Sequence, residues 1–227
     1  MTGFSLVDYA SLAFFGAAWL TYHLGVETTR AGGRSLNRLM DGYRHLWMER
    51  MLTRENRMVD TSIMAALQNG TAFFASTSLI AVGGALTLFK YTDDVLTVFA
   101  EVPLGLATTR LAWELKVIGL AVIFVYAFFK FAWSYRLFNY AAILMGAVPL
   151  QRDEATPQAL AAVRRVAALH VVAGKHFNRG QRAFFFALAY LGWFISAYVF
   201  MAATAAVLYV IWRRQFASDA IAALDDR

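Results

Sequence analysis

The sequence contains no cysteine among its 227 residues. Disulfide bridges, thiolate metal sites, iron–sulfur clusters and a cysteine nucleophile are therefore excluded, and the redox state of the compartment leaves no mark on the sequence. A nucleophile elbow, a phosphate-binding glycine loop and an HExxH motif are missing as well. No two histidines have the i, i+4 spacing of a helical metal site. The sequence therefore predicts no metal site, no cofactor and no catalytic group.

Charged residues are scarce, at 16% of the chain, whereas hydrophobic residues make up 59% and the mean hydropathy is +0.50. Soluble domains contain roughly 45–50% apolar residues, so the excess indicates a non-aqueous solvent. The formal net charge of +6 would suggest a nucleic-acid partner in a soluble protein. Here the positive residues gather between long apolar runs, which favours a role in membrane topology and no nucleic-acid binding.

Four stretches are long and apolar enough to cross a bilayer, for which a helix needs about 20 mainly apolar residues. They are residues 5–26, 64–89, 115–136 and 184–212. Trp193 and Trp212 lie 19 residues apart, which suits indole rings at the two water boundaries of the fourth span. No strand signal and no internal repeat is present. The sequence therefore predicts an all-α polytopic membrane protein, with one domain over residues 1–227 and four transmembrane helices in a bundle.

The basic residues predict the orientation, because short loops rich in Lys and Arg stay in the cytoplasm. Seven arginines lie between the first and second spans, and six basic residues lie between the third and fourth. Both loops are therefore expected in the cytoplasm and both termini in the periplasm. Arg213 and Arg214, at the outer end of the fourth span, argue against this orientation.

Two further helices are predicted in the cytoplasm, as extensions of the bundle. In residues 35–52, Ser35 is a candidate N-cap and apolar residues recur at helical spacing, with arginines on the other side. This helix either lies on the inner leaflet, where arginines meet anionic lipid, or packs on the extended third and fourth helices. In residues 157–173, Thr156 and Pro157 mark a helix start and Gly174 a stop.

Ionisable and polar residues within the spans are the first candidates for function. With the outer helix ends level, six of them fall near the inner boundary: His23, Glu27, Gln68, Asn69, Arg136 and Asn139. We predict that they form one cluster, which is either a site for an ion, a proton or a lipid headgroup, or a structural lock between helices; the lock is favoured. Lys130 lies deeper, and either its stem snorkels to the inner headgroups or it forms a buried pair. A transmembrane haem needs two deep histidines, and only His23 is near such a position.

Small residues on the second and fourth spans are predicted to let helices approach closely in lipid, in preference to lining a pore. They are Ser76, Gly83, Gly192 and Ser196.

Three runs in order along the chain resemble a known family. The first holds Asn56, Arg57, Asp60, Gln68 and residues 73–77; the second holds residues 129–131, Trp133, Arg136 and 138–140; the third holds residues 177–180, Arg182 and 184–188. Together they resemble the membrane protein family called domain of unknown function 599, over nearly the whole chain. The resemblance implies a bacterial inner-membrane protein, and it brings no reaction, cofactor or site residues.

These observations favour a non-enzymatic integral membrane protein that acts by association, as a homo-oligomer or as an accessory subunit of a membrane complex. The expected partners are the lipid bilayer, including anionic lipid at the cytoplasmic face, and a second copy or another membrane protein. The alternative is a channel or transporter that uses the predicted polar cluster, although repeated broken helix pairs are missing. A membrane enzyme is the third hypothesis.

Overall fold

The computed structural model describes residues 3–27, 35–101, 109–150 and 156–224. This part of the chain is helical and contains no strand, which confirms the predicted all-α class. The helices are α1 (Leu6–Glu27), α2 (Leu36–Met51), α3 (Met58–Lys90), α4 (Thr92–Glu101), α5 (Arg110–Gly146), α6 (Pro157–Leu191), α7 (Ala197–Phe216) and α8 (Asp219–Ala222), with a 3₁₀ turn, η2 (Gly192–Phe194), between α6 and α7.

Hydroxyl side chains cap the starts of α2, α5, α6 and α7, whereas α3 has no side-chain cap. The Ser35 side chain accepts a hydrogen bond from the backbone N–H of Arg38 at the start of α2. Thr156 does the same for Ala159 at the start of α6, where Pro157 occupies the first turn. Each cap satisfies a backbone donor that the first helical turn leaves unpaired. The helix starts predicted at Ser35 and Thr156 are confirmed.

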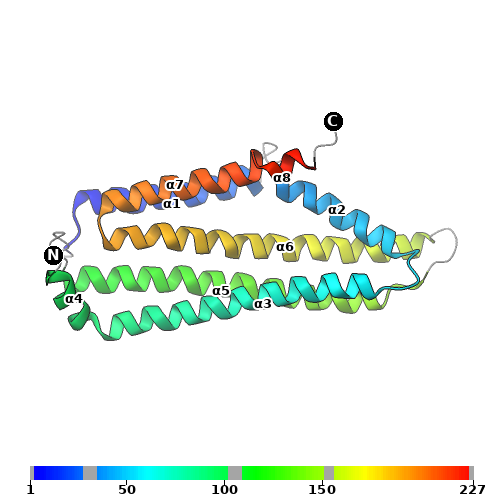
Figure 1. Cartoon of the computed structure of the whole chain (residues 1–227), viewed down its shortest axis with the longest axis horizontal. Helices are drawn as coiled ribbons and strands as arrows, with labels where there is room; N and C mark the ends of the chain where they lie inside the picture. The colour runs from blue at the N-terminus through cyan, green and yellow to red at the C-terminus, as the bar shows by residue number, and fades with distance from the viewer. Residues whose placement is uncertain (1–2, 28–34, 102–108, 151–155, 225–227) are drawn as a thin grey trace.

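Three long helices form the body of the molecule, with α5 between α3 and α6 (Figure 1). They contain 33, 37 and 35 residues, or about 50–55 Å each at 1.5 Å per residue. On the other side of α6, the parallel pair α1 and α7 covers one half of its length, and α2 covers the other half (Figure 1). The bundle thus has a section containing α1 and α7 and an extension containing α2.

A seven-residue repeat of small and apolar side chains holds the long helices together. On α3 the buried residues include Met64, Thr71, Ser78 and Ala85; on α6 they include Ala159, Val166, Ala173, Gly180 and Ala187. A seven-residue period keeps one seam facing its partner when the helices coil around each other with a left-handed twist. At Gly180 a Cβ atom would lie 2.7 Å from the ring of Phe131, so the two helix surfaces touch there.

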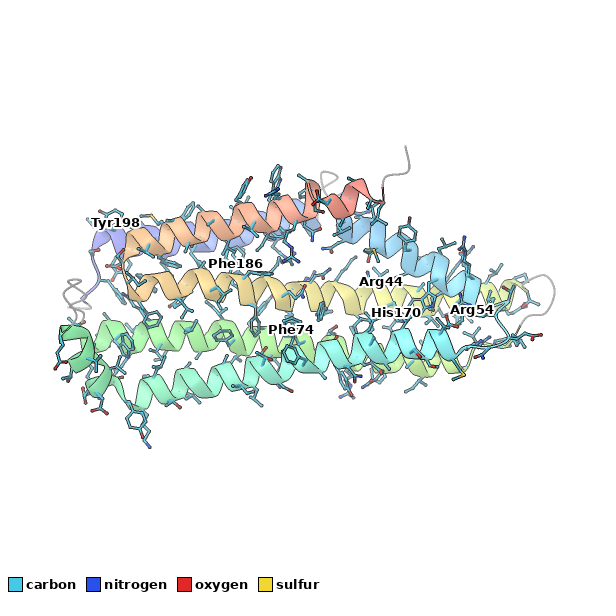
Figure 2. The ribbon with its side chains drawn as sticks, viewed as in Figure 1. Arg44, Arg54, Phe74, His170, Phe186 and Tyr198 are labelled. Carbon is cyan, nitrogen blue, oxygen red and sulfur yellow. The ribbon has the colours of Figure 1, made fainter. Side chains whose placement is uncertain are left out.

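Aromatic rings fill the core of the section that contains α1 and α7. Phe74 of α3 stacks on Phe131 of α5 at 5.3 Å between ring centroids, and Phe186 of α6 meets Phe15 of α1 at 5.4 Å (Figure 2). In the extension, Met48 and Met51 of α2 are fully buried against α5 and α6. The amphipathic helix therefore packs on the bundle, which resolves the alternative left open by its sequence.

The predicted helix 157–173 is wrong at its end, because α6 continues through Gly174 to Leu191. The glycine is buried, and a Cβ atom on it would lie 2.8 Å from a guanidinium nitrogen of Arg44. Arg44 belongs to α2, so the missing side chain makes room for a neighbouring helix. The glycine is therefore a packing residue within a continuous helix.

The predicted fourth span, residues 184–212, is not one helix. The chain leaves α6 at Leu191, turns through η2 and runs back as α7, whose first turn is capped by Ser196. A Cβ atom on Gly192 would lie 3.1 Å from the carbonyl oxygen of Val199, so glycine permits this reversal. Trp193 stacks on Phe200 at 5.4 Å between ring centroids. It therefore lies in a turn between two helices, and it does not mark one end of a single span.

The predicted span 5–26 overlaps α1, and the spans 64–89 and 115–136 lie within α3 and α5, which by length and composition could cross a membrane. Only 11% and 28% of their most apolar windows are buried, unlike the core helices of soluble proteins. Within the described part of the chain, five helices have 20 residues or more, namely α1, α3, α5, α6 and α7, and α1 and α7 run in the same direction (Figure 1). The prediction that both termini lie on one side of a membrane rested on the single helix 184–212 and loses that basis.

Candidate functional site

The structure brings together two of the six residues of the predicted polar cluster. Nε2 of Gln68 on α3 donates a hydrogen bond of 2.7 Å to Oδ1 of Asn139 on α5. Arg136, one turn before Asn139, is exposed and donates from Nε to the Tyr140 hydroxyl at 2.6 Å. Asn69 is also exposed. The contact between Gln68 and Asn139 joins α3 to α5 at the start of the extension.

The remaining members of the cluster belong to α1, which packs on α7 and not chiefly on α3 or α5. His23 is half-buried there, and the side chain of Glu27 lies outside the described part of the chain. Lys130 is half-buried on α5, and its ammonium lies 5.0 Å from the ring centroid of Tyr126 on the preceding turn. The described side chains thus do not converge on one site at this depth.

The small residues that were predicted to pack helices have two different environments. Gly192 is in close contact with α7, and Ser196 accepts a hydrogen bond of 3.1 Å from the Val199 N–H. Ser76 and Gly83 are exposed on α3, and no atom lies within 4 Å of a Cβ placed on Gly83. These two do not pack helices within one chain, because the contact of α3 with α5 uses the Met64 to Ala85 repeat instead.

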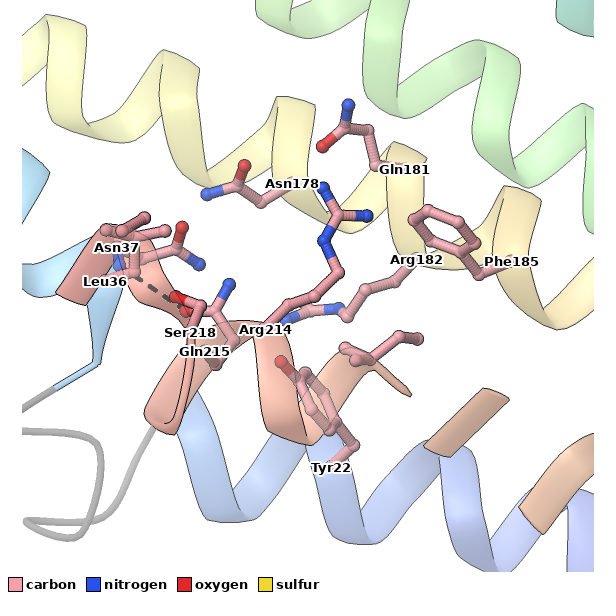
Figure 3. A pocket seen from close by; sticks show the side chains of 12 residues that line it. Tyr22, Leu36, Asn37, Asn178, Gln181, Arg182, Phe185, Arg214, Gln215 and Ser218 are labelled. Carbon is pink, nitrogen blue, oxygen red and sulfur yellow. Dashed lines mark hydrogen bonds between the residues drawn. The ribbon is translucent and has the colours of Figure 1, made fainter. Parts of the chain in front are cut away.

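The reversal at η2 returns the end of α7 to the middle of α6 and leaves a cavity of about 300 Å³ between them that is partly open to the surface (Figure 3). Four elements supply its walls: the end of α1, the start of α2, the middle of α6 and the end of α7 with the residues that follow it. The polar side chains that line it are Tyr22, Asn37, Asn178, Gln181, Arg182, Arg214, Gln215 and Ser218.

Two arginines from different helices line this cavity, the half-buried Arg182 and the exposed Arg214, and their side chains cross in the view of Figure 3. Arg182 of α6 reaches toward α1, where its guanidinium carbon lies 5.2 Å from the ring centroid of Tyr22. Arg214 of α7 reaches toward α6 and lies 5.6 Å from the ring centroid of Phe185. Cation–π contacts of this kind hold a planar guanidinium in one orientation.

The described lining of the cavity is basic and polar, and Asp219 lines an adjoining pocket together with Arg214 and Ser218. The lining of the cavity itself, as far as the structure describes it, contains both arginines and no aspartate or glutamate. The Ser218 hydroxyl is buried and has no hydrogen-bond partner there. The backbone N–H of Asn37 donates to Oε1 of Gln215 at 3.4 Å, which ties the start of α2 to the end of α7. Two guanidinium groups with amide and hydroxyl neighbours suit a phosphate or carboxylate, which accept bidentate hydrogen bonds.

The sequence prediction missed this cavity because it treated residues 184–212 as one helix. Arg182 and Arg214 are 32 residues apart, about 48 Å along a continuous helix, and were placed at opposite ends of a span. Two signals pointed to the reversal: Gly192 followed by a serine that can cap a helix, and the basic pair Arg213 and Arg214 on the side predicted to lack positive charge.

Three or more His, Asp or Glu side chains positioned to hold a metal ion do not occur among the described residues. No curated protein and no solved structure matches the chain. The model of a family described as protein of unknown function, DUF599, matches residues 10–220. This match runs from within α1 to within α8 and includes the described residues that line the cavity. The chain therefore belongs to the DUF599 family.

Proposed function

We propose that this protein is a non-enzymatic integral membrane protein that binds an anionic ligand between α1, α6 and α7, at the cytoplasmic face of a bacterial inner membrane. The observation that carries the proposal is the pair Arg182 and Arg214, which line one cavity together with amide and hydroxyl side chains. A guanidinium group binds phosphate or carboxylate through charge-assisted, often bidentate hydrogen bonds, and here two of them come from different helices.

Membrane insertion of α1, α3, α5, α6 and α7 is supported by apolar side chains that point away from the bundle. Ile80, Phe73 and Phe129 are 74%, 65% and 65% exposed. At 1.5 Å per residue, the 22 residues of α1 and the 20 of α7 span about 33 and 30 Å, close to the thickness of the hydrocarbon core. We therefore place the section containing α1 and α7 in the bilayer and the extension outside it.

The orientation follows from the arginines of the extension, which favour the cytoplasm. α1 then begins in the periplasm, and α7 ends in the cytoplasm after the fifth crossing. This arrangement places Arg213 and Arg214 on the cytoplasmic side, together with the basic residues of α2 and α6. The basic pair that argued against a four-span topology thus supports a five-span topology.

The absence of cysteine makes this topology directly testable with single introduced cysteines. We expect Asp94→Cys on α4 to react with a membrane-impermeant maleimide in intact cells. Glu49→Cys on α2 and Ala223→Cys after α8 are expected to react only after the membrane is opened. All three positions are exposed. Reaction of Ala223→Cys in intact cells would place the end of α7 in the periplasm and contradict the five-span proposal.

Anion binding is tested with glycerol 3-phosphate, a phosphate monoester without an acyl chain. In detergent it is expected to raise the melting temperature of the protein above that in sodium chloride of equal ionic strength, because a ligand that binds only the folded state stabilises it. Arg182→Ala and Arg214→Ala are expected to abolish this rise. Arg213→Ala is the matched control, since Arg213 is the neighbour of Arg214 and does not line the cavity. Equal responses in all four proteins would refute the proposal.

Association within the membrane is a second candidate function, favoured by the packing of α3. Its main long-helix partner in the described chain is α5, and its opposite face exposes Ser76, Gly83 and large apolar side chains. Small residues let a helix from a second copy or from another membrane protein approach closely. The mass of the particle in mild detergent tests this candidate, and a monomer without a co-purifying protein counts against it.

A further inference from the structure

We infer that the anionic ligand is a phospholipid with a net negative headgroup, whose phosphate lies between Arg182 and Arg214 and whose acyl chain lies in a groove between α1 and α7. The inference deepens the proposed anion binding and rests on it. It names the class of ligand and the path of its apolar part, which the arginine cavity alone does not define.

The groove has a volume of about 510 Å³ and lies between the facing sides of α1 and α7. Its walls are Phe14, Leu208, Trp212 and Phe216, with the small residues Gly25 and Ala205 leaving space between them. Tyr22 lines both this groove and the arginine cavity, so the two spaces adjoin at one side chain. An apolar groove that ends beside a cationic cavity suits an amphiphile with one charged end.

The depth of the two spaces agrees with that of a lipid in the inner leaflet. Arg214 lies two residues before the end of α7, and Tyr22 lies five residues before the end of α1. With both helices spanning the hydrocarbon core, the guanidinium groups stand at the level of the headgroups. The groove extends from Gly25 back to Phe14, about 16 Å along α1, toward the middle of the bilayer.

The lining of the cavity selects among phospholipids. The headgroup of a phosphatidylcholine ends in a quaternary ammonium, which can neither donate nor accept a hydrogen bond with the amide and hydroxyl side chains of the lining. The headgroup of a phosphatidylglycerol consists of a phosphate and a glycerol with hydroxyl groups, and it has no cation. Its hydroxyls suit the amide side chains of Asn178 and Gln181 and the unpaired hydroxyl of Ser218. We therefore expect preference for the anionic lipid.

The test uses the full chain in detergent micelles that contain equal amounts of phosphatidylglycerol and phosphatidylcholine, followed by removal of free lipid and mass spectrometry of the bound fraction. Wild-type protein is expected to retain phosphatidylglycerol in preference by about tenfold, the size of effect that a charge-assisted hydrogen bond gives. Arg214→Ala is expected to lose this preference and also the response to glycerol 3-phosphate.

The groove is tested separately by filling it. Ala205 lines the groove and its neighbour Ala206 does not, and both are exposed on α7. Ala205→Phe is expected to reduce retained phosphatidylglycerol by about tenfold or more and to keep the response to glycerol 3-phosphate, because the arginine cavity stays intact. Ala206→Phe is expected to behave as wild type. If Ala205→Phe fails to fold, Gly25→Leu fills the same groove from α1.

The outcomes separate the two proposals. If the wild-type protein responds to glycerol 3-phosphate but does not prefer phosphatidylglycerol, the lipid inference is overturned and anion binding stays in place. The same holds if Ala205→Phe and Gly25→Leu both retain phosphatidylglycerol in full. The absence of any response to glycerol 3-phosphate in wild-type protein, together with equal retention of both lipids, overturns both.

Discussion

Replacement of Asp60 by alanine is expected to lower the free energy of unfolding by about 3 kcal/mol and to release α2 from the bundle. The Asp60 side chain is fully buried at the start of α3, where it accepts a 2.7 Å hydrogen bond from the indole N–H of Trp47 and forms an ion pair with Arg54. Trp47 belongs to α2 and Arg54 to the turn between α2 and α3. One carboxylate therefore holds helix, turn and helix together.

The magnitude follows from what the substitution leaves behind. Loss of one member of a buried ion pair costs about 3–5 kcal/mol when the remaining charge stays buried. The Arg54 side chain is 37% exposed and can turn to water, which favours the lower end of this range. The indole N–H of the half-buried Trp47 loses its acceptor, which adds to the cost. A loss of about 3 kcal/mol corresponds to a fall of about 6–12 °C in melting temperature for a chain of this size.

Two measurements check this expectation. The melting temperature in detergent reports the global loss, and the rate of tryptic cleavage after Arg54 and Arg57 reports the release of the α2–α3 turn. Arg57 normally donates hydrogen bonds to the carbonyl oxygens of Val148 at 2.7 Å and Pro149 at 3.2 Å, which anchors the turn to the end of α5. Asp94→Ala removes an exposed carboxyl group on α4 and is the control. Cleavage of Asp60→Ala at the wild-type rate would disprove the anchoring role.

The helices of this protein could be predicted where the sequence carries a long apolar stretch or a residue that caps a helix start. Apolar length predicted α1, α3 and α5, and the hydroxyl caps at Ser35 and Thr156 predicted the starts of α2 and α6. The reversal at Gly192 could not be predicted in this way, because α7 is as apolar as the end of α6. Hydropathy records how apolar a residue is and carries no information on the direction in which the chain runs. The contacts between Gly192, Trp193 and Phe200 decide that direction, and they exist only in the folded chain.

For the candidate site, the sequence predicted the depth of each residue along the bundle but not the direction in which its side chain faces. Residue counting placed Gln68 and Asn139 at one depth, and they are bonded in the structure. Arg136 has a similar depth, yet it faces outward with Tyr140. Counting along a helix gives the height of a residue, whereas the rotation of the helix about its axis is set by the seam with its neighbours. The pair Arg182 and Arg214 depends on the reversal as well, and was therefore beyond the prediction.

The extension that contains α2 is expected to lose stability in acid because of His170 on α6. Its imidazole is fully buried, with ring centroids 5.1 Å from Trp47 and 5.6 Å from Phe138, and neither ring nitrogen has a hydrogen-bond partner in the described structure (Figure 2). Burial, assisted by the nearby positive charge of Arg44, lowers the pKa of His170 from 6.5 to about 4. The side chain is therefore neutral in the folded protein at pH 7.

The sign of the pH effect follows from comparing the folded and unfolded chains. As the pH falls below 6.5, the unfolded chain binds a proton at His170 and the folded chain does not, so stability is lost between pH 6.5 and 4. By pH 4 the loss reaches about 3 kcal/mol. Burial raises the pKa of Asp41 on α2, which gives a contribution of the opposite sign. The contribution of Asp41 cancels when the wild-type protein is compared with a His170 variant, because both contain Asp41.

His170→Phe is expected to abolish this acid sensitivity, because a phenyl ring of similar size fits between Trp47 and Phe138 and binds no proton. Melting temperatures of the two proteins should be close at pH 7.5 and should diverge as the pH falls toward 4.5, with the variant the more stable. His45→Phe replaces an exposed histidine on α2 and is expected to follow the wild-type profile. Parallel profiles for wild type and His170→Phe would mean that His170 is protonated in the folded extension, and thus that water or a polar partner reaches its ring.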